Sequence, residues 1–183
     1  MENATDTQIL SFVQNPAHVE KGFRLLLATY QERLYWHIRK LVIEHEDAND
    51  VLQNVLIKVY RNIQKFEGKA QLFTWLYRIA TNESLTFLTR KKKKLAISLD
   101  EEVSQVGANL VADTYFEGSQ IQIKLQQAIL QLPEKQKLVF VMRYFEGLSY
   151  EAISEILATS KGGLKASYHH AVKKIEKFIK AND

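Results

Sequence analysis

The chain has 183 residues and a mass of 21.2 kDa, which is enough for one ordinary domain or two small ones and excludes a large multidomain enzyme. It contains no cysteine, which excludes disulfides, thiolate metal sites and a cysteine nucleophile and is typical of a protein of the reducing cytoplasm. With 46% hydrophobic residues, seven glycines and two prolines, the composition favours a folded and largely helical chain.

No segment of the sequence is apolar enough to cross a membrane. The longest apolar run, residues 138–142, has five residues, whereas a membrane-spanning helix needs about 20. The first six residues are polar and acidic and lack the pattern of a signal peptide, in which basic residues precede an apolar segment. We therefore expect a cytoplasmic protein with no membrane insertion.

The sign of the charge changes along the chain. The formal net charge is +4, and Lys and Arg outnumber Asp and Glu in residues 1–94 and again in residues 124–183. Residues 95–123 contain no Lys or Arg but hold Asp100, Glu101, Glu102, Asp113 and Glu117. We predict two domains, 1–94 and 124–183, joined by a flexible acidic linker that is most simply a spacer.

Helical patterns fill the first predicted domain. Asn15 followed by Pro16 predicts a helix start, and residues 23–67 contain no Pro or Gly, so we expect helix there with an interruption near residues 44–47. One apolar face recurs at helical spacing: Val51, Leu52, Val55, Leu56, Val59, Tyr60 and Ile63. The opposite stripe consists of Asp47, Asp50, Asn54, Lys58 and Arg61.

A further helix is predicted over about residues 71–90, after a break at Gly68. Its inward residues are expected to be Phe73, Leu76, Ala80, Ser84 and Phe87. Its outward side is expected to carry Thr74, Arg78 and Asn82 with Trp75 beside them, although Trp75 is equally compatible with a place in the core. The helix ends in the unbroken basic run Arg90-Lys91-Lys92-Lys93-Lys94, which exceeds what a helix C-terminus requires and favours contact with a polyanion.

The second domain is predicted to contain four helical segments. The first starts near Leu125 and ends before Pro133, and the next begins with Pro133 as its first residue and ends at Gly147. Ser149 is expected to cap a short helix, and Ser160 a last helix. The inward residues are expected to be Val139, Met142, Phe145, Ile153, Ile156, Leu157, Leu164, Tyr168, Val172 and Ile175.

The last two helices, joined by a turn of about three residues, form a helix-turn-helix pattern. The last helix carries a stripe at four-residue spacing on its solvent side: Lys161, Lys165, His169, Lys173 and Lys177. Such a helix fits a major groove, where the stripe would meet phosphates. An ordinary basic surface helix is the alternative interpretation of the stripe.

Four motifs occur in order in this sequence: residues 47–55 (DANDVLQNV), 73–82 (FTWLYRIATN), 132–136 (LPEKQ) and 145–153 (FEGLSYEAI). Together they closely resemble the extracytoplasmic-function sigma factors of the sigma-70 family, which are small two-domain initiation subunits of bacterial RNA polymerase. The resemblance covers about residues 5–180. It implies an all-α fold with a region 2 domain that reads and melts the −10 promoter element, a region 4 domain that reads the −35 element, and a linker that threads the polymerase.

The resemblance also implies a polymerase-binding surface. In the family, the helix with the first motif docks on the clamp coiled coil of core RNA polymerase, and the flap is a further expected contact. The matching residues lie on the side away from the apolar face: Asp47, Asp50, Gln53 and Asn54. Carboxylates and amides there can pair with Arg and other donors, although family members commonly have an acidic residue at the position of Asn54. The two aspartates can also stabilise a helix N-terminus.

For the −10 element, the resemblance places a pocket for an unstacked base in the loop of residues 66–71. An aromatic face, a cation and an amide beside this loop are the combination that binds single-stranded DNA. The residues expected to contact this strand or the adjoining duplex are Lys69, Ala70, Gln71, Trp75, Arg78, Asn82, Arg90, Lys91 and Lys92.

For the −35 element, the family resemblance implies contacts from the start of the last helix. The expected residues are Ser160, Lys161, Gly163, Lys165, Ala166, Ser167, His169, His170 and Lys173. Ser167 and His170 stand where the family usually has Arg, which removes fixed positive charge. The two histidines have no carboxylate at ligand spacing, so we expect no metal site.

Other function classes are compatible with parts of the sequence. A conventional activator or repressor would use the helix-turn-helix alone and leave residues 1–94 as a sensor, but these show no strand pattern and no ligand motif. A sigma mimic would bind an inhibitor without reading DNA, which the basic stripe and Trp75 argue against. No nucleophile–base set or phosphate loop supports an independent enzyme, and we expect no cofactor. By analogy with the family, an anti-sigma factor is an expected partner.

Overall fold

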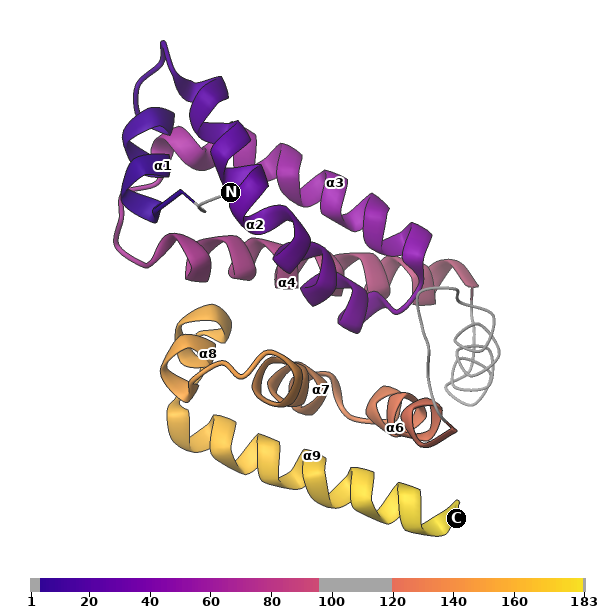
Figure 1. The fold of residues 1–183 in the computed structure, drawn as a ribbon. Coiled ribbons are helices and arrows are strands. Elements are labelled where there is room, and N and C mark those ends of the chain that lie inside the picture. The colour runs from indigo at the N-terminus through magenta and orange to yellow at the C-terminus, as the bar shows by residue number, and fades with distance from the viewer. Residues whose placement is uncertain (1–3, 96–119, 183) are drawn as a thin grey trace. The chain divides into compact units, whose positions relative to one another are not determined.

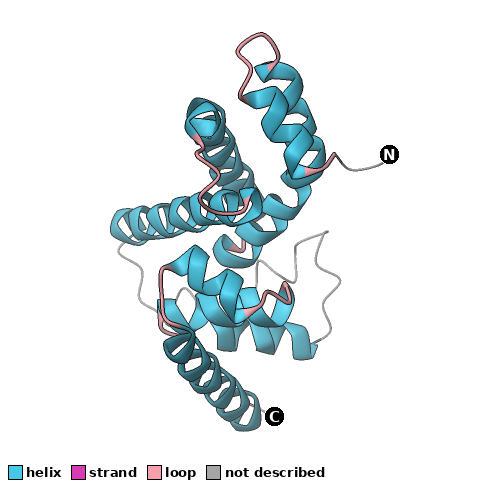
Figure 2. Cartoon of the chain, turned by 90° about the vertical axis from the view of Figure 1, so that its left-hand side faces the viewer, coloured by secondary structure: helices cyan, strands magenta, loops and turns pink. Residues whose placement is uncertain are grey.

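The computed structural model describes residues 4–95 and 120–182, and over these residues the chain forms helices and no strand (Figures 1 and 2). The chain divides into two compact units, Met1–Thr89 and Arg90–Asp183. The predicted all-α class with two helical domains is confirmed. The five acidic residues of the predicted linker lie outside the described residues, and the domain boundaries at 94 and 124 stay a prediction.

The first unit is built from α1 (Asp6–Val13), α2 (Val19–Val42), α3 (His45–Asn62), the short 3-10 helix η1 (Ile63–Lys65) and most of α4 (Leu72–Leu95). α2 packs against α1 and against α3, which lies beside it in Figure 1. Fully buried aliphatic side chains from all four α-helices form the core, among them Ile9, Leu26, Leu34, Ile38, Val55 and Leu76. Burial of each such side chain contributes about 1.5–3 kcal/mol.

The predicted helix start at Asn15 is wrong. The Asn15 side chain accepts a hydrogen bond from the backbone N–H of Ala17 at 3.0 Å, which stabilises a turn, and α2 begins at Val19. The sequence interpretation also missed α1, which starts with a capping box between Thr5 and Gln8. Each error comes from a short polar side chain whose local bond decides where a helix starts.

α1 is held tightly on α2. A Cβ on Gly22 would lie 2.6 Å from Cγ1 of Val13, so glycine is what permits this approach of the two helices. The Tyr30 hydroxyl donates to Asp6 at 2.5 Å, and burial, together with this bond, raises the pKa of Tyr30 above its ordinary value. The chain then breaks after α2 at Ile43, a buried β-branched residue with φ 72°, just before the predicted interruption.

The predicted apolar face is confirmed at Val51, Leu52, Val55 and Val59 of α3 and at Ile63 of η1, which are all buried, whereas Leu56 is half-buried. Tyr60 is an exception, because its side chain is 45% exposed and packs edge-on against Phe23 of α2.

On α4 the predicted outward position of Thr74 is wrong, since Thr74 is buried. Of the predicted inward residues of α4, Leu76, Ala80 and Ser84 are buried, whereas Phe73 and Phe87 are half-buried. Beside Ser84, α4 also buries a stripe that was not predicted, formed by Thr74, Tyr77 and Thr81. Buried hydroxyls in this stripe and of Ser84 donate to carbonyls one turn earlier, for example Thr81 to Tyr77 at 2.8 Å and Ser84 to Ala80 at 2.9 Å. His37 of α2 meets the same stripe, with its Nε2 2.9 Å from the Thr81 hydroxyl. A polar but internally satisfied face therefore joins α2 to α4.

The second unit contains α6 (Gln120–Leu130), α7 (Glu134–Phe140), the π-helical turn η2 (Val141–Phe145), α8 (Tyr150–Leu157) and α9 (Lys161–Ala181). α9 packs against α6, α7 and α8. The buried side chains include Ile129, Val139, Met142, Ile153, Leu164, Ala171 and Ile175. Of the inward residues predicted for α9, Tyr168 and Val172 are half-buried.

The stop at Gly147 and the caps at Ser149 and Ser160 are confirmed. Two predicted helix starts are wrong, because Pro133 is the N-cap of α7 instead of its first residue, and α6 begins at Gln120 instead of near Leu125. Gly147 has φ 64°, which an L side chain rarely adopts. Ser149 accepts from the N–H of Ala152 at 3.1 Å, and Ser160 accepts from the N–H of Gly163 at 3.3 Å. Residues 158–160 form the turn between α8 and α9, the length predicted for a helix-turn-helix. Within residues 4–95 and 120–182, no helix has both the length and the hydropathy of a membrane span.

Candidate nucleic-acid and protein interfaces

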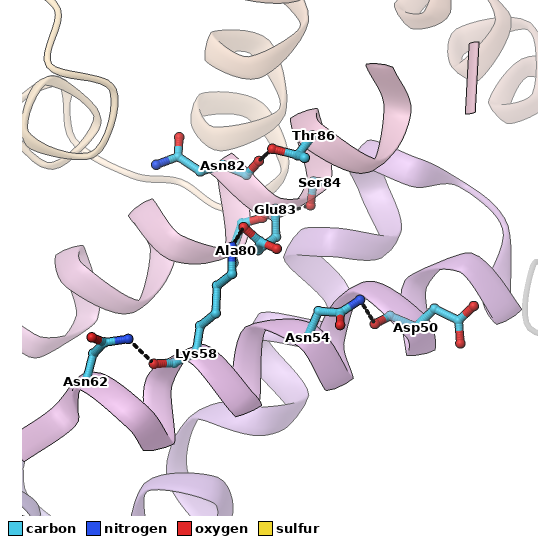
Figure 3. A network of polar contacts seen from close by, with 9 residues as sticks. All are labelled: Asp50, Asn54, Lys58, Asn62, Ala80, Asn82, Glu83, Ser84 and Thr86. Carbon is cyan, nitrogen blue, oxygen red and sulfur yellow. Dashed lines mark hydrogen bonds and ion pairs between the residues drawn. The ribbon is translucent and has the colours of Figure 1, made fainter. Parts of the chain in front are cut away.

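The first half of α3 presents a polar surface. Asp50, Gln53 and Asn54 are exposed, and Asp47 is half-buried. The Asn54 amide donates to the backbone carbonyl of Asp50 at 3.0 Å, while the Asp50 carboxylate points away from the helix (Figure 3). The structure therefore leaves a carboxylate and two amides on one accessible face, which can pair with cationic or hydrogen-bonding groups of a partner.

A pocket of about 360 Å³ opens between the second half of α3 and the first half of α4. It is lined by Lys58, Asn62, Lys65, Phe66, Trp75 and Ile79. The Phe66 and Trp75 rings are tilted at 49°, with their centroids 5.3 Å apart, so together they make an aromatic wall. Trp75 is half-buried, and it both supports Phe66 and faces the pocket.

The polar side of this pocket comes from the end of α3 and from η1. The Lys58 ammonium forms an ion pair with Glu83 of α4 (Figure 3). The Asn62 amide donates to the Lys58 carbonyl at 2.8 Å. Lys65 is exposed. Sequence analysis did not identify Lys58, Asn62, Lys65 and Ile79 as site residues, although the four-residue spacing of Lys58 and Asn62 just before the predicted loop was an available signal.

None of the other residues predicted to contact the −10 strand lines the pocket. Lys69 is exposed and paired with Glu67, Ala70 is half-buried, and the Gln71 carbonyl accepts from the N–H of Trp75 at 3.1 Å. Gly68 has φ 71°, which turns the loop before α4.

Farther along α4, Arg78 and Asn82 are exposed. In the terminal basic run Arg90, Lys92 and Lys93 are exposed and Lys91 is half-buried. α4 thus carries an aromatic residue, an amide and several cations along its length.

In the second unit α9 presents an exposed, basic surface. Lys165, Ala166, His169, His170 and Lys173 are exposed, as is Lys177, whereas Ser167 is half-buried. Ser160 and Gly163 have a structural function as well, because a Cβ on Gly163 would lie 3.2 Å from the capping hydroxyl of Ser160. Among the described residues no group of three or more His, Cys, Asp or Glu side chains could hold a metal ion.

Two contacts tie this surface to the preceding elements, and neither was predicted. Lys161 bonds Glu151 of α8 at 2.9 Å, and this hydrogen bond lowers the pKa of the Glu151 carboxyl. The Tyr150 ring lies beneath two cations, with Arg143 at 5.1 Å and Lys165 at 5.9 Å from its centroid. Arg143 also donates to the Leu148 carbonyl at 2.9 Å, which fixes its position before α8.

Comparison with known proteins gives matches to both units. The family models described as Sigma-70 region 2 and Sigma-70, region 4 match residues 26–94 and 122–175. An ECF RNA polymerase sigma-E factor of Haemophilus influenzae is 32% identical, with 97% of each chain covered. The ECF RNA polymerase sigma factor SigW of Bacillus subtilis is also 32% identical, over 88% of this chain and 93% of its own length.

Solved structures have the same fold. CnrH in complex with the cytosolic domain of CnrY superimposes with a TM-score of 0.68 at 18% identity, covering 97% of this chain and 96% of that chain. The sigma factor RpoE of Bartonella quintana, in complex with the anti-sigma factor NepR, gives a TM-score of 0.66 at 19% identity, covering 89% and 99%.

Proposed function

The chain belongs to the extracytoplasmic-function sigma factors of the sigma-70 family, and from this premise we propose which of its surfaces hold polymerase and promoter. As a sigma factor it binds core RNA polymerase, directs it to specific promoters and assists promoter melting in transcription initiation. We assign −10 recognition to residues 1–94, −35 recognition to residues 124–183, and a linker function to residues 95–123.

The polar face of α3 is the proposed contact with the clamp coiled coil of polymerase. It presents Asp50 and the amides of Gln53 and Asn54 to solvent, and Asp47 lies in the first turn. A carboxylate that meets an Arg across an interface makes a charge-assisted hydrogen bond, about twice as strong as a neutral one. The flap is the proposed second contact of polymerase with the chain.

The pocket between α3 and α4 is the proposed site for one unstacked base of the −10 strand, and this pocket is the observation that carries the assignment. Its aromatic wall of Phe66 and Trp75 offers a stacking surface, worth about 1–3 kcal/mol per base. Unstacking one base costs a similar few kcal/mol, so capture of the base shifts the equilibrium toward melted DNA without any chemical step. Arg78, Asn82 and the loop residues Lys69, Ala70 and Gln71 would then contact the adjoining nucleotides.

The basic run at the end of α4 and the start of α9 are the proposed duplex contacts. Arg90, Lys91 and Lys92 would meet DNA upstream of the melted segment. On α9 the groove-facing residues would be Ser160, Lys161, Gly163, Lys165, Ala166, Ser167, His169, His170 and Lys173. Lys165 is fixed over Tyr150, and Arg143 on the same ring supplies a further cation for phosphate.

An anti-sigma factor is a further proposed partner, because one structure with this fold is a sigma factor in complex with an anti-sigma factor, RpoE with NepR. Sigma factors are non-catalytic initiation factors, and we propose that this chain likewise has no enzymatic activity and acts in the cytoplasm, where polymerase transcribes.

Run-off transcription tests the function as a whole. Core polymerase with this protein should initiate at defined start sites, and mapping those sites after overexpression would yield the two promoter elements and their spacing. Binding to polymerase without any start-site selection across a promoter library would instead show a sigma mimic.

Charge reversal at Asp50 tests the polymerase surface. Asp50→Lys should weaken binding to core polymerase at least tenfold, because a like charge would then face the clamp. Affinity is measured by fluorescence polarisation at physiological salt. Glu32→Lys, which reverses the charge of an exposed residue on α2 instead of α3, is the matched control and should leave affinity unchanged. If the Asp50→Lys protein bound polymerase as tightly as this control, the assignment of the α3 face as the polymerase contact would be wrong.

A further inference from the structure

We propose that Glu83 is a positioning residue that makes the pocket between α3 and α4 selective for a base instead of a phosphate, because it holds and neutralises Lys58. The proposal rests on the proposed function, in which this pocket receives an unstacked base of the −10 strand. Glu83 does not line the pocket and acts through Lys58, which does.

The geometry makes Glu83 the fixed member of this ion pair. The Glu83 side chain is 17% exposed, whereas the Lys58 side chain is 54% exposed. Glu83, which belongs to α4, is therefore the less mobile partner. The longer and more exposed Lys58 side chain extends from α3 to meet its carboxylate (Figure 3). The backbone of Lys58 is also tied, since its carbonyl accepts from the Asn62 amide at 2.8 Å.

The second cation of the pocket has a different environment. Lys65 is exposed, and within residues 4–95 and 120–182 it makes no ion pair. The lining therefore contains one paired lysine, Lys58, and one lysine without an ion pair among these residues, Lys65. The apolar side chains of Phe66, Trp75 and Ile79 belong to the same lining.

This division of charge decides what the pocket accepts. Every nucleotide carries the same phosphate, so an unpaired lysine in the pocket lining would attract the backbone of any strand in any register. The ion pair with Glu83 offsets the charge of Lys58 and restrains its ammonium group. A base can then stack on the aromatic wall while Lys65 attracts the phosphate.

The test is the isosteric substitution Glu83→Gln in the complete protein bound to core polymerase. The probes are promoter fragments with a pre-melted −10 segment, each with a different base at one −10 position. The freed Lys58 should bind one more phosphate, so the slope of log affinity against log salt should steepen by about 0.7, the value for one contact on single-stranded DNA. The ratio of affinities for the preferred and the other bases should fall toward one.

Two variants keep the result interpretable. The double variant Lys58→Gln/Glu83→Gln should return the salt slope to the wild-type value, since no cation is freed. Glu32→Gln changes the net charge equally but lies on α2, and it should leave both the slope and the base preference unchanged. The Lys58 member of the pair is 54% exposed, so the pair contributes little to stability and we expect all variants to keep the wild-type circular dichroism spectrum.

The outcomes separate this proposal from the one on which it rests. A Glu83→Gln protein with wild-type salt slope and wild-type base preference would overturn the role of Glu83. A double variant that keeps the steeper slope would overturn it too, because Lys58 would not be the cause. If the wild-type holoenzyme itself shows no base preference on the pre-melted fragments, the pocket assignment fails instead.

Discussion

The pocket of the first unit and the α9 surface of the second unit both place a lysine against a glutamate of the neighbouring helix, yet they differ in shape and exposure. In the pocket, Lys58 meets a Glu83 side chain that is 17% exposed, beside an aromatic wall. On the second unit, Lys161 meets a Glu151 side chain that is 65% exposed, beside a row of exposed cations. A pocket that contains an ion pair and an aromatic wall suits one base, whereas an exposed cationic helix suits the repeated phosphates of a duplex.

The largest expected effect is at Trp75. Trp75→Ala should weaken binding of holoenzyme to a pre-melted −10 fragment by roughly 5 to 150-fold, because about 1–3 kcal/mol of stacking is lost. Binding to a duplex −35 fragment should not change. Equilibrium binding to the two fragments, measured in parallel, checks this prediction.

Trp75→Phe is the control for Trp75→Ala, since it keeps an aromatic face against Phe66 and should recover most of the affinity. A half-buried tryptophan also contributes to packing, so the thermal midpoint of each variant is measured as well. If Trp75→Ala lowered the thermal midpoint strongly and left strand binding intact in the folded fraction, Trp75 would be a core residue and the contrast between the two units would be lost.

An intermediate effect is expected on the binding of duplex DNA by the basic surface of α9. The double variant Lys165→Ala/Lys173→Ala should reduce the slope of log affinity against log salt by about 1.8 on a duplex −35 fragment, because each phosphate contact on duplex DNA contributes about 0.9. Lys177→Ala, farther along the same stripe, is the matched single-charge control and should have a smaller effect. An unchanged slope in the double variant would mean that α9 does not face the phosphates.

The smallest effect concerns the pH dependence of stability at Glu151. Its pKa is lower in the folded protein than its ordinary value of 4.5, so the folded state binds fewer protons there than the unfolded state. The stabilisation by this carboxylate is present above the ordinary pKa and is lost as the pH falls through the lowered pKa. The thermal midpoint of the wild-type protein should exceed that of Glu151→Gln slightly at pH 7. The difference should vanish once the pH has fallen below the lowered pKa of the folded state. A difference that grew on acidification would contradict the Lys161–Glu151 contact.

Much of the fold followed from local patterns in the sequence. The apolar spacing from Val51 to Ile63 predicted the buried face of α3, and Ser149 and Ser160 predicted the starts of α8 and α9, because capping depends on residues three positions apart. Thr74 was wrongly placed on the outward side because its burial is not determined by local sequence. Which faces of α4 are covered depends on helices far away in the sequence, such as α2 with His37.

The candidate site was predictable only in part. Trp75 was identified from its place on α4, but the pocket also needs Lys58, Asn62 and Lys65 from across the loop. The four-residue spacing puts Lys58 and Asn62 on one side of α3, but it does not show that this side meets α4. The Lys58–Glu83 pair was missed for the same reason, since it joins positions 25 residues apart. The predicted stripe on α9 is exposed as expected, whereas the neutralisation of Lys161 by Glu151 depends on the geometry of the turn between two helices.

The most direct test of separate DNA-binding functions in the two units is to measure the binding of two variants to two DNA fragments. Holoenzymes with Trp75→Ala and with Lys165→Ala/Lys173→Ala are each titrated with the pre-melted −10 fragment and with the duplex −35 fragment. We predict that the first variant loses affinity for the pre-melted fragment alone and the second for the duplex alone. Equal losses on both fragments, in either variant, would contradict separate base-holding and duplex-holding surfaces.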